Sequence, residues 1–136
     1  MKDKHILFLI TIILDIYLLL VLCTQNNNNH DCLFIYLSLI VHFFFYIGLI
    51  YENIIILDIS HIFVFLLPLI SIFILNKQIK CSILGLLLTI QILWIIKGKC
   101  ILHSLPTNFI NFGYGNTIQV FTIIICLILV YQVLYN

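Results

Sequence analysis

Hydrophobic positions in this chain fall into long unbroken stretches separated by short polar segments. Neither the three-to-four-residue period of an amphipathic helix nor the strict alternation of a half-buried strand is present. Length therefore decides, because a helix crosses a bilayer in about 17–25 residues, whereas a barrel strand needs only about ten. The pattern predicts an all-α integral membrane protein, a bundle of five transmembrane helices with short loops, spanning 6–23, 33–50, 54–75, 82–96 and 118–134.

The region from Cys32 to Leu75 is almost continuously apolar and needs an internal turn. As one helix it would be about 65 Å long, roughly twice the hydrocarbon thickness of a bilayer. The polar step Tyr51–Asn53 is the best position for that turn. If the stretch Glu52–His61 lies along the membrane surface instead, the third span is partial and the bundle has four complete spans.

The segments between the spans predict a single domain covering residues 1–136. Residues 24–31 are rich in asparagine, 76–80 form a short basic turn, and 97–117 contain proline and three glycines, so we expect a loop there. The first stretch follows two lysines like a signal peptide, but Leu22 precedes Cys23 where cleavage needs a small residue, so we expect it to be retained. Four lysines against two favour a cytoplasmic or matrix-like amino terminus and a carboxyl terminus on the opposite side.

Composition supports lipid as the solvent. The 136 residues are 64% hydrophobic and 8% charged, against about 45–50% and about 25% in soluble domains. A net charge of +1 gives no basis for binding nucleic acid, which requires clustered lysine and arginine. Alanine and arginine, which have GC-rich codons, are both absent from the sequence, which indicates an AT-rich genome such as that of an organelle, a protist or a large DNA virus.

Four ionisable residues fall within the predicted spans: Asp15, His42, Asp58 and His61. Such groups are costly in hydrocarbon unless they are paired or hydrated, so they are the first place to look for function. Asp58 and His61 share a helix face, as a carboxylate that orients an imidazole behind haem or a metal would, and the four could form a proton path. The favoured interpretation is structural, with Asp15 bonding His42 or a neighbouring hydroxyl and so fixing the helix register.

The five cysteines show no metal-ligand spacing, so we expect neither a metal nor a cofactor. Cys23 and Cys32 close the asparagine-rich loop, and a disulfide between them is feasible if that side of the membrane is oxidising. Free thiols are the equal alternative.

The segment after the fourth span carries a short pattern, with Trp94 followed by a basic turn and then Cys100 and Leu102. On these residues the chain resembles small multi-span membrane proteins encoded by large DNA viruses. It is also similar to bacterial four-span proteins that carry Cys-Pro-Leu-Thr at this place, although Ile101 and His103 differ from that pattern. Neither resemblance implies a chemistry.

The rest of this loop spaces the aromatic residues Phe109, Phe112 and Tyr114 among glycine and asparagine. They are candidates for docking a partner subunit, since aromatic side chains dominate interface anchors, and an interfacial aromatic belt is the alternative. We predict a non-enzymatic structural or accessory subunit of a larger membrane assembly, in contact with lipid and with other membrane or capsid subunits, and no small-molecule substrate is evident. The expected locations are the internal membrane of a virion, with its minor-capsid layer, and an organelle inner membrane holding a respiratory complex. The alternative function is proton conduction or haem binding through the four intramembrane groups.

Overall fold

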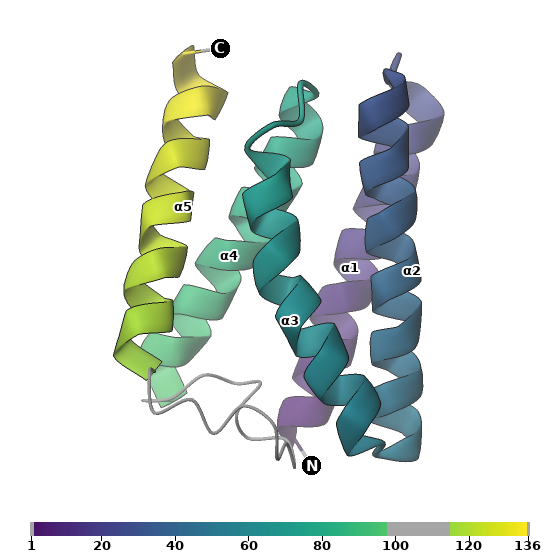
Figure 1. Cartoon of the computed structure of the whole chain (residues 1–136), viewed down its shortest axis with the longest axis vertical. Helices are drawn as coiled ribbons and strands as arrows, with labels where there is room; N and C mark the ends of the chain where they lie inside the picture. The colour runs from purple at the N-terminus through teal and green to yellow at the C-terminus, as the bar shows by residue number, and fades with distance from the viewer. Residues whose placement is uncertain (1, 98–114, 136) are drawn as a thin grey trace.

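The computed structural model describes residues 2–97 and 115–135, with the side chains of 4–97 and 119–135, and all of its regular structure is helical. The helices run up and down in chain order, and the two termini lie at opposite ends of the molecule (Figure 1). Their bounds are α1 Lys2–Thr24, α2 Asn29–Tyr51, α3 Ile54–Ser71, α4 Lys77–Lys97 and α5 Gly115–Tyr135.

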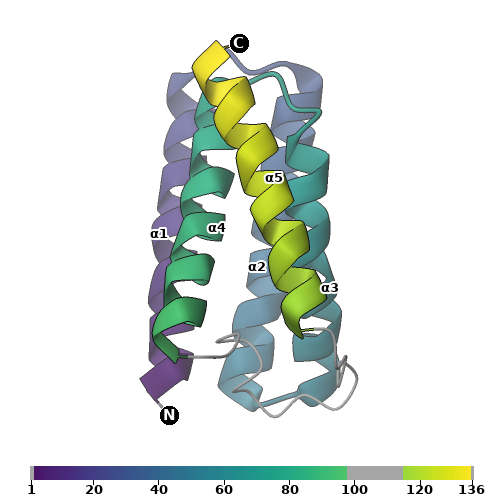
Figure 2. The same ribbon diagram turned by 90° about the vertical axis from the view of Figure 1, so that its left-hand side faces the viewer.

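The first four helices form a closed ring. Each packs against the next along the chain, and α1 also packs against α4, so the ring closes. The fifth helix lies outside the ring against α4 and α3, as Figure 2 shows. The deepest core lies where the helices meet, and its fully buried large side chains are Leu18, Ile35, Leu49, Ile79, Ile83, Leu87, Ile125 and Leu129.

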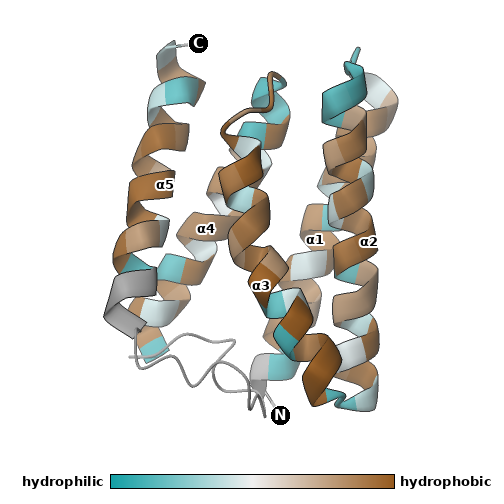
Figure 3. Cartoon of the chain, in the orientation of Figure 1, coloured by the Kyte–Doolittle hydropathy of each residue, from teal (hydrophilic) through white to brown (hydrophobic). Residues whose placement is uncertain are grey.

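Helices α1 to α4 are each long and apolar enough to cross a lipid bilayer. In α5 the described apolar part is shorter, Gln119–Tyr135. Figure 3 shows hydrophobic residues over most of every helix, with hydrophilic residues concentrated toward the helix ends. Large apolar side chains such as Ile13, Phe43 and Leu127 are exposed on the outer surface. This exterior has the character expected of a surface in contact with lipid, and it indicates an integral membrane protein.

The predicted turn between the second and third spans is confirmed. Glu52 ends α2 in the left-handed conformation (φ 53°), and the Asn53 side chain accepts the Ile56 N–H to cap α3. Gly48 permits the tight hairpin, because a Cβ there would lie 3.0 Å from the Leu57 side chain. The stretch 54–61 belongs to one continuous helix of 18 residues, so the third helix is among the four able to span a membrane.

The predicted third span, 54–75, is too long, since α3 ends at Ser71. The Ser71 hydroxyl donates to the Pro68 carbonyl oxygen (2.7 Å), and the Ile72 N–H bonds Leu69 and Ile70 instead of continuing the α-helical pattern. The amides of residues 72–74 bond carbonyls three residues earlier, and the buried Asp31 carboxylate accepts the next two amides, those of Leu75 and Asn76. The chain then turns through 72–76 into α4, which begins five residues before the predicted position, at Lys77 instead of residue 82.

Candidate functional site

The most concentrated polar contact inside the bundle joins α1 to α2 around Asp15. His42 Nδ1 lies 2.5 Å from Asp15 Oδ1, and the Tyr46 hydroxyl donates to Asp15 Oδ2 over 2.6 Å. His42 and Tyr46 are four residues apart, so they present adjacent side chains on one face of α2. Both oxygens of the Asp15 side chain are therefore in hydrogen-bond contact with side chains of the neighbouring helix.

This cluster, Asp15–His42–Tyr46, is largely removed from the surface. The side chain of His42 is 8% exposed and that of Asp15 is 17% exposed. Phe8, two turns before Asp15 on the same face of α1, packs against the Tyr46 ring at 5.0 Å. The contacts with His42 and Tyr46 satisfy both oxygens of Asp15 within the bundle. Such an arrangement suits hydrocarbon, where an uncompensated charge costs about 2.5–3.5 kcal/mol or more.

The sequence-based prediction placed Asp15 beside a hydroxyl or His42, and the structure brings it to both. Tyr46 was not predicted as a member of the cluster. Its spacing of four residues from His42 is the signal that could have identified it.

The second predicted pair, Asp58 and His61, lies on α3 and is also buried. The His61 ring stacks on Phe65, one turn further along, with centroids 5.4 Å apart and planes inclined by 25°. The expected shared face of Asp58 and His61 is the inward face of α3, which also holds Leu57 and Ser60.

A second polar centre, which was not predicted from the sequence, lies at the end of the bundle where the α1–α2 and α3–α4 turns meet. Asp31 is only 3% exposed, and its Oδ1 accepts the backbone N–H groups of Leu75 and Asn76 (3.3 and 3.4 Å). The Asn76 side chain donates to Asn27 (2.6 Å) and accepts from the N–H of Gln78, in the first turn of α4 (2.8 Å). One buried carboxylate and two asparagines thus join the α1–α2 turn to the α3–α4 turn, which is a structural role.

Hydroxyl groups within the helices mostly bond the backbone of their own helix. Ser and Thr side chains at seven positions donate to a carbonyl three or four residues earlier: Thr11, Thr24, Ser38, Ser71, Ser82, Thr89 and Thr122. Between helices, the buried Gln91 amide of α4 also donates to the Thr122 hydroxyl of α5. These bonds satisfy polar groups where water is absent.

The remaining predicted sites lie partly outside the described residues. Cys23 and Cys32 are free thiols in the structure, and their disulfide stays a prediction. Cys100, Leu102 and the aromatic residues Phe109, Phe112 and Tyr114 fall in the segment that the structure does not describe. Within the described ranges, no three His, Cys, Asp or Glu side chains gather as they would to hold a metal ion.

Comparison with known proteins assigns no function to the chain. No protein-family model matches the chain, and neither a curated protein nor a solved structure matches it. The fold defines a class: a small helical protein in which four of the described helices are long and apolar enough to cross a membrane.

Proposed function

We propose that this protein is a structural or accessory subunit of a larger membrane assembly, with α5 as its fifth membrane span. The observation that carries the proposal is that both oxygens of the Asp15 side chain contact polar side chains of α2. A carboxylate whose two oxygens both serve an interhelical contact fixes the register of α1 and α2. Assembly of the bundle thereby accounts for this polar cluster.

The outer face of α5 supports a docking role. Five exposed apolar side chains follow one another at alternating spacings of four and three residues: Val120, Ile124, Leu127, Tyr131 and Leu134. That spacing is the one with which helices pack side by side at small crossing angles. We expect a transmembrane helix of the partner to lie along this stripe, with the loop residues Phe109, Phe112 and Tyr114 as further contacts.

The resemblance around Trp94 favours one setting for such an assembly, the internal membrane and minor-capsid layer of a large DNA virus. A membrane subunit of an organelle-encoded respiratory complex is the alternative setting. The proposal for docking through α5 is the same in both.

The test is co-purification. The tagged full-length chain is isolated in a mild maltoside detergent from its native membrane, and the retained proteins are quantified by mass spectrometry. We expect a partner of fixed stoichiometry, lost when Leu127 and Tyr131 are changed to alanine and kept when the exposed α2 residues Ile40 and Phe43 are changed in the same way. Absence of any stoichiometric partner, or equal loss in both variants, would contradict the proposal.

A second candidate function, proton conduction, is favoured by one specific observation. The short Asp15–His42 contact and the buried residues Asp58 and His61 place four titratable groups on three helices that pack in sequence. Proton flux into liposomes that disappears with Asp15→Asn would favour this function. A Soret band that disappears with His42→Ala or His61→Ala would favour haem binding instead.

A further inference from the structure

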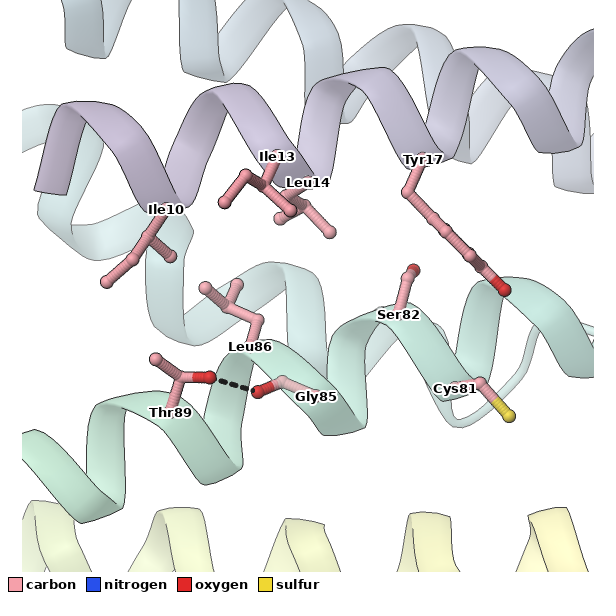
Figure 4. Close-up of a pocket in the computed structure, with 9 residues that line it drawn as sticks. All are labelled: Ile10, Ile13, Leu14, Tyr17, Cys81, Ser82, Gly85, Leu86 and Thr89. Carbon is pink, nitrogen blue, oxygen red and sulfur yellow. Dashed lines mark hydrogen bonds between the residues drawn. The ribbon is translucent and has the colours of Figure 1, made fainter. Parts of the chain in front are cut away.

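A lateral groove between α1 and α4 has no role in the functions considered so far. Its volume is about 410 Å³, within the range of small-molecule sites. Figure 4 shows the side chains that line it: Ile10, Ile13, Leu14 and Tyr17 from α1, and Cys81, Ser82, Gly85, Leu86 and Thr89 from α4. The groove is apolar along most of its length, and none of the four intramembrane ionisable residues lines it.

Gly85 is exposed where it lines the groove. A Cβ placed there would meet nothing within 4 Å, so no part of the chain that the structure describes fills the space above this glycine. Gly48, in contrast, is covered by the Leu57 side chain at 3.0 Å. The open glycine therefore marks a surface that something outside the described chain can fill.

One end of the groove is polar. Tyr17 donates its hydroxyl proton to the Gln78 side-chain oxygen (2.6 Å), which leaves the Gln78 NH₂ group directed to other acceptors. Lys77 is exposed and lies one turn before Cys81, on the same face of α4. Within the described ranges, Lys77 forms no ion pair, and α4 has no acidic residue in its first turn.

The length of the groove indicates which kind of molecule fits it. The groove extends about 12 Å along α4, from Cys81 to Thr89, and Lys77 lies about 6 Å beyond it. The groove and the lysine together match the roughly 15 Å depth of one hydrocarbon leaflet. A partner helix would need a seat along the full bilayer thickness, about twice this length. An acyl chain of a single leaflet, with its phosphate beside a lysine at the membrane boundary, matches both the length and the charge.

We propose that the α1–α4 groove binds one phospholipid molecule, with the phosphate at Lys77 and Gln78 and an acyl chain lying over Gly85 toward Thr89. The cationic lysine favours a lipid of net negative charge over a zwitterionic one. This inference does not depend on the proposed subunit function, because it concerns a different face of the bundle.

The experiment uses the full chain, purified in maltoside and stripped of lipid. Binding of palmitoyl-oleoyl phosphatidylglycerol and of the matching phosphatidylcholine is followed by native mass spectrometry. We expect one molecule of either lipid to bind, with phosphatidylglycerol preferred. Gly85→Phe fills the groove and should weaken binding at least about tenfold, which corresponds to about 1.4 kcal/mol. Lys77→Gln should abolish the preference for phosphatidylglycerol.

Two control variants test whether the loss of lipid binding is specific to the groove. Ile40→Phe introduces the same ring on the exposed face of α2, and lipid binding should be unchanged. Gly85→Leu repeats the block with a smaller side chain, and circular dichroism verifies that each variant folds. Equal lipid binding by the native chain and both Gly85 variants would overturn the proposal. So would a native dimer that Gly85→Phe converts to a monomer, because a second copy would then be the occupant.

Discussion

The interhelical contact of Asp15 with His42 and Tyr46 makes a quantitative prediction. Asp15→Leu removes two hydrogen bonds and leaves the buried His42 and the half-buried Tyr46 without their partner. Interhelical hydrogen bonds in membrane proteins contribute about 0.6 kcal/mol on average and about 1.7 kcal/mol at most. The two bonds together should therefore contribute about 1–3 kcal/mol to the free energy of unfolding.

The single variant alone does not isolate this contribution. Replacing a carboxylate by leucine also removes the cost of burying that carboxylate, which opposes the loss of the bonds. A double-mutant cycle of Asp15→Leu with His42→Leu separates the two effects, because the cost of burial is common to both arms. We expect a coupling free energy of about 0.6–1.7 kcal/mol between positions 15 and 42.

The assay is reversible unfolding in mixed dodecyl sulfate and maltoside micelles, followed by circular dichroism. A control cycle pairs Asp15→Leu with Gln91→Leu, since Gln91 bonds Thr122 on α5 and not the Asp15 cluster. Distant positions are additive within about 0.3–0.5 kcal/mol, so the control should fall inside that range. A 15–42 coupling equally small would refute the role assigned to the contact.

Three further predictions concern the ends of the bundle. Gly48→Ala should destabilise the protein by about 1 kcal/mol in the same unfolding assay, since the added methyl group would lie 3.0 Å from Leu57 and this crowding outweighs the gain in helix propensity. An equally stable variant would show that Leu57 moves aside. Asp31→Leu should speed hydrogen exchange of the Asn76 amide, measured by mass spectrometry, because that amide loses its acceptor. Asp31→Asn keeps an acceptor oxygen and should keep most of the protection. Equal exchange in the two variants would contradict the role of Asp31 as the acceptor. Lys4 of α1 forms an ion pair with Glu52 at the end of α2, with Nζ 3.1 Å from Oε1. Lys4→Gln should change the free energy of unfolding by less than about 1 kcal/mol, because the Glu52 side chain is 72% exposed. A larger change would refute this estimate.

The sequence predicted the helical architecture because lipid imposes a simple rule on composition and length. It predicted the turn at Glu52 for the same reason, as a polar step inside an apolar run. It did not predict the end of α3, because hydropathy records no difference between helical and non-helical apolar backbone at 72–75. The turn depends instead on Asp31 of α2, which accepts the Leu75 and Asn76 amides, and hydropathy does not record such a long-range contact.

The candidate site was only partly predictable. Asp15 and His42 stand out because ionisable residues are rare in apolar stretches, but which of several groups they contact depends on how helices are rotated against one another. Tyr46 was overlooked because a tyrosine is common in such helices. Asp31 was assigned to a loop because the sequence around it is polar, whereas the structure places it inside α2 and almost fully buried.

The bond between Asp15 and α2 also has a consequence for how the protein is made. During synthesis α1 emerges before α2, so the Asp15 carboxylate lacks its partners until His42 and Tyr46 have been made. An aspartate at the centre of an inserting helix costs about 2.5–3.5 kcal/mol, while each leucine or isoleucine returns about 0.3–0.6 kcal/mol. About six such side chains offset it, and α1 has more than enough of them. Helix α1 can therefore enter the bilayer without α2. Helix α2 then packs against it in the orientation that brings His42 and Tyr46 to Asp15.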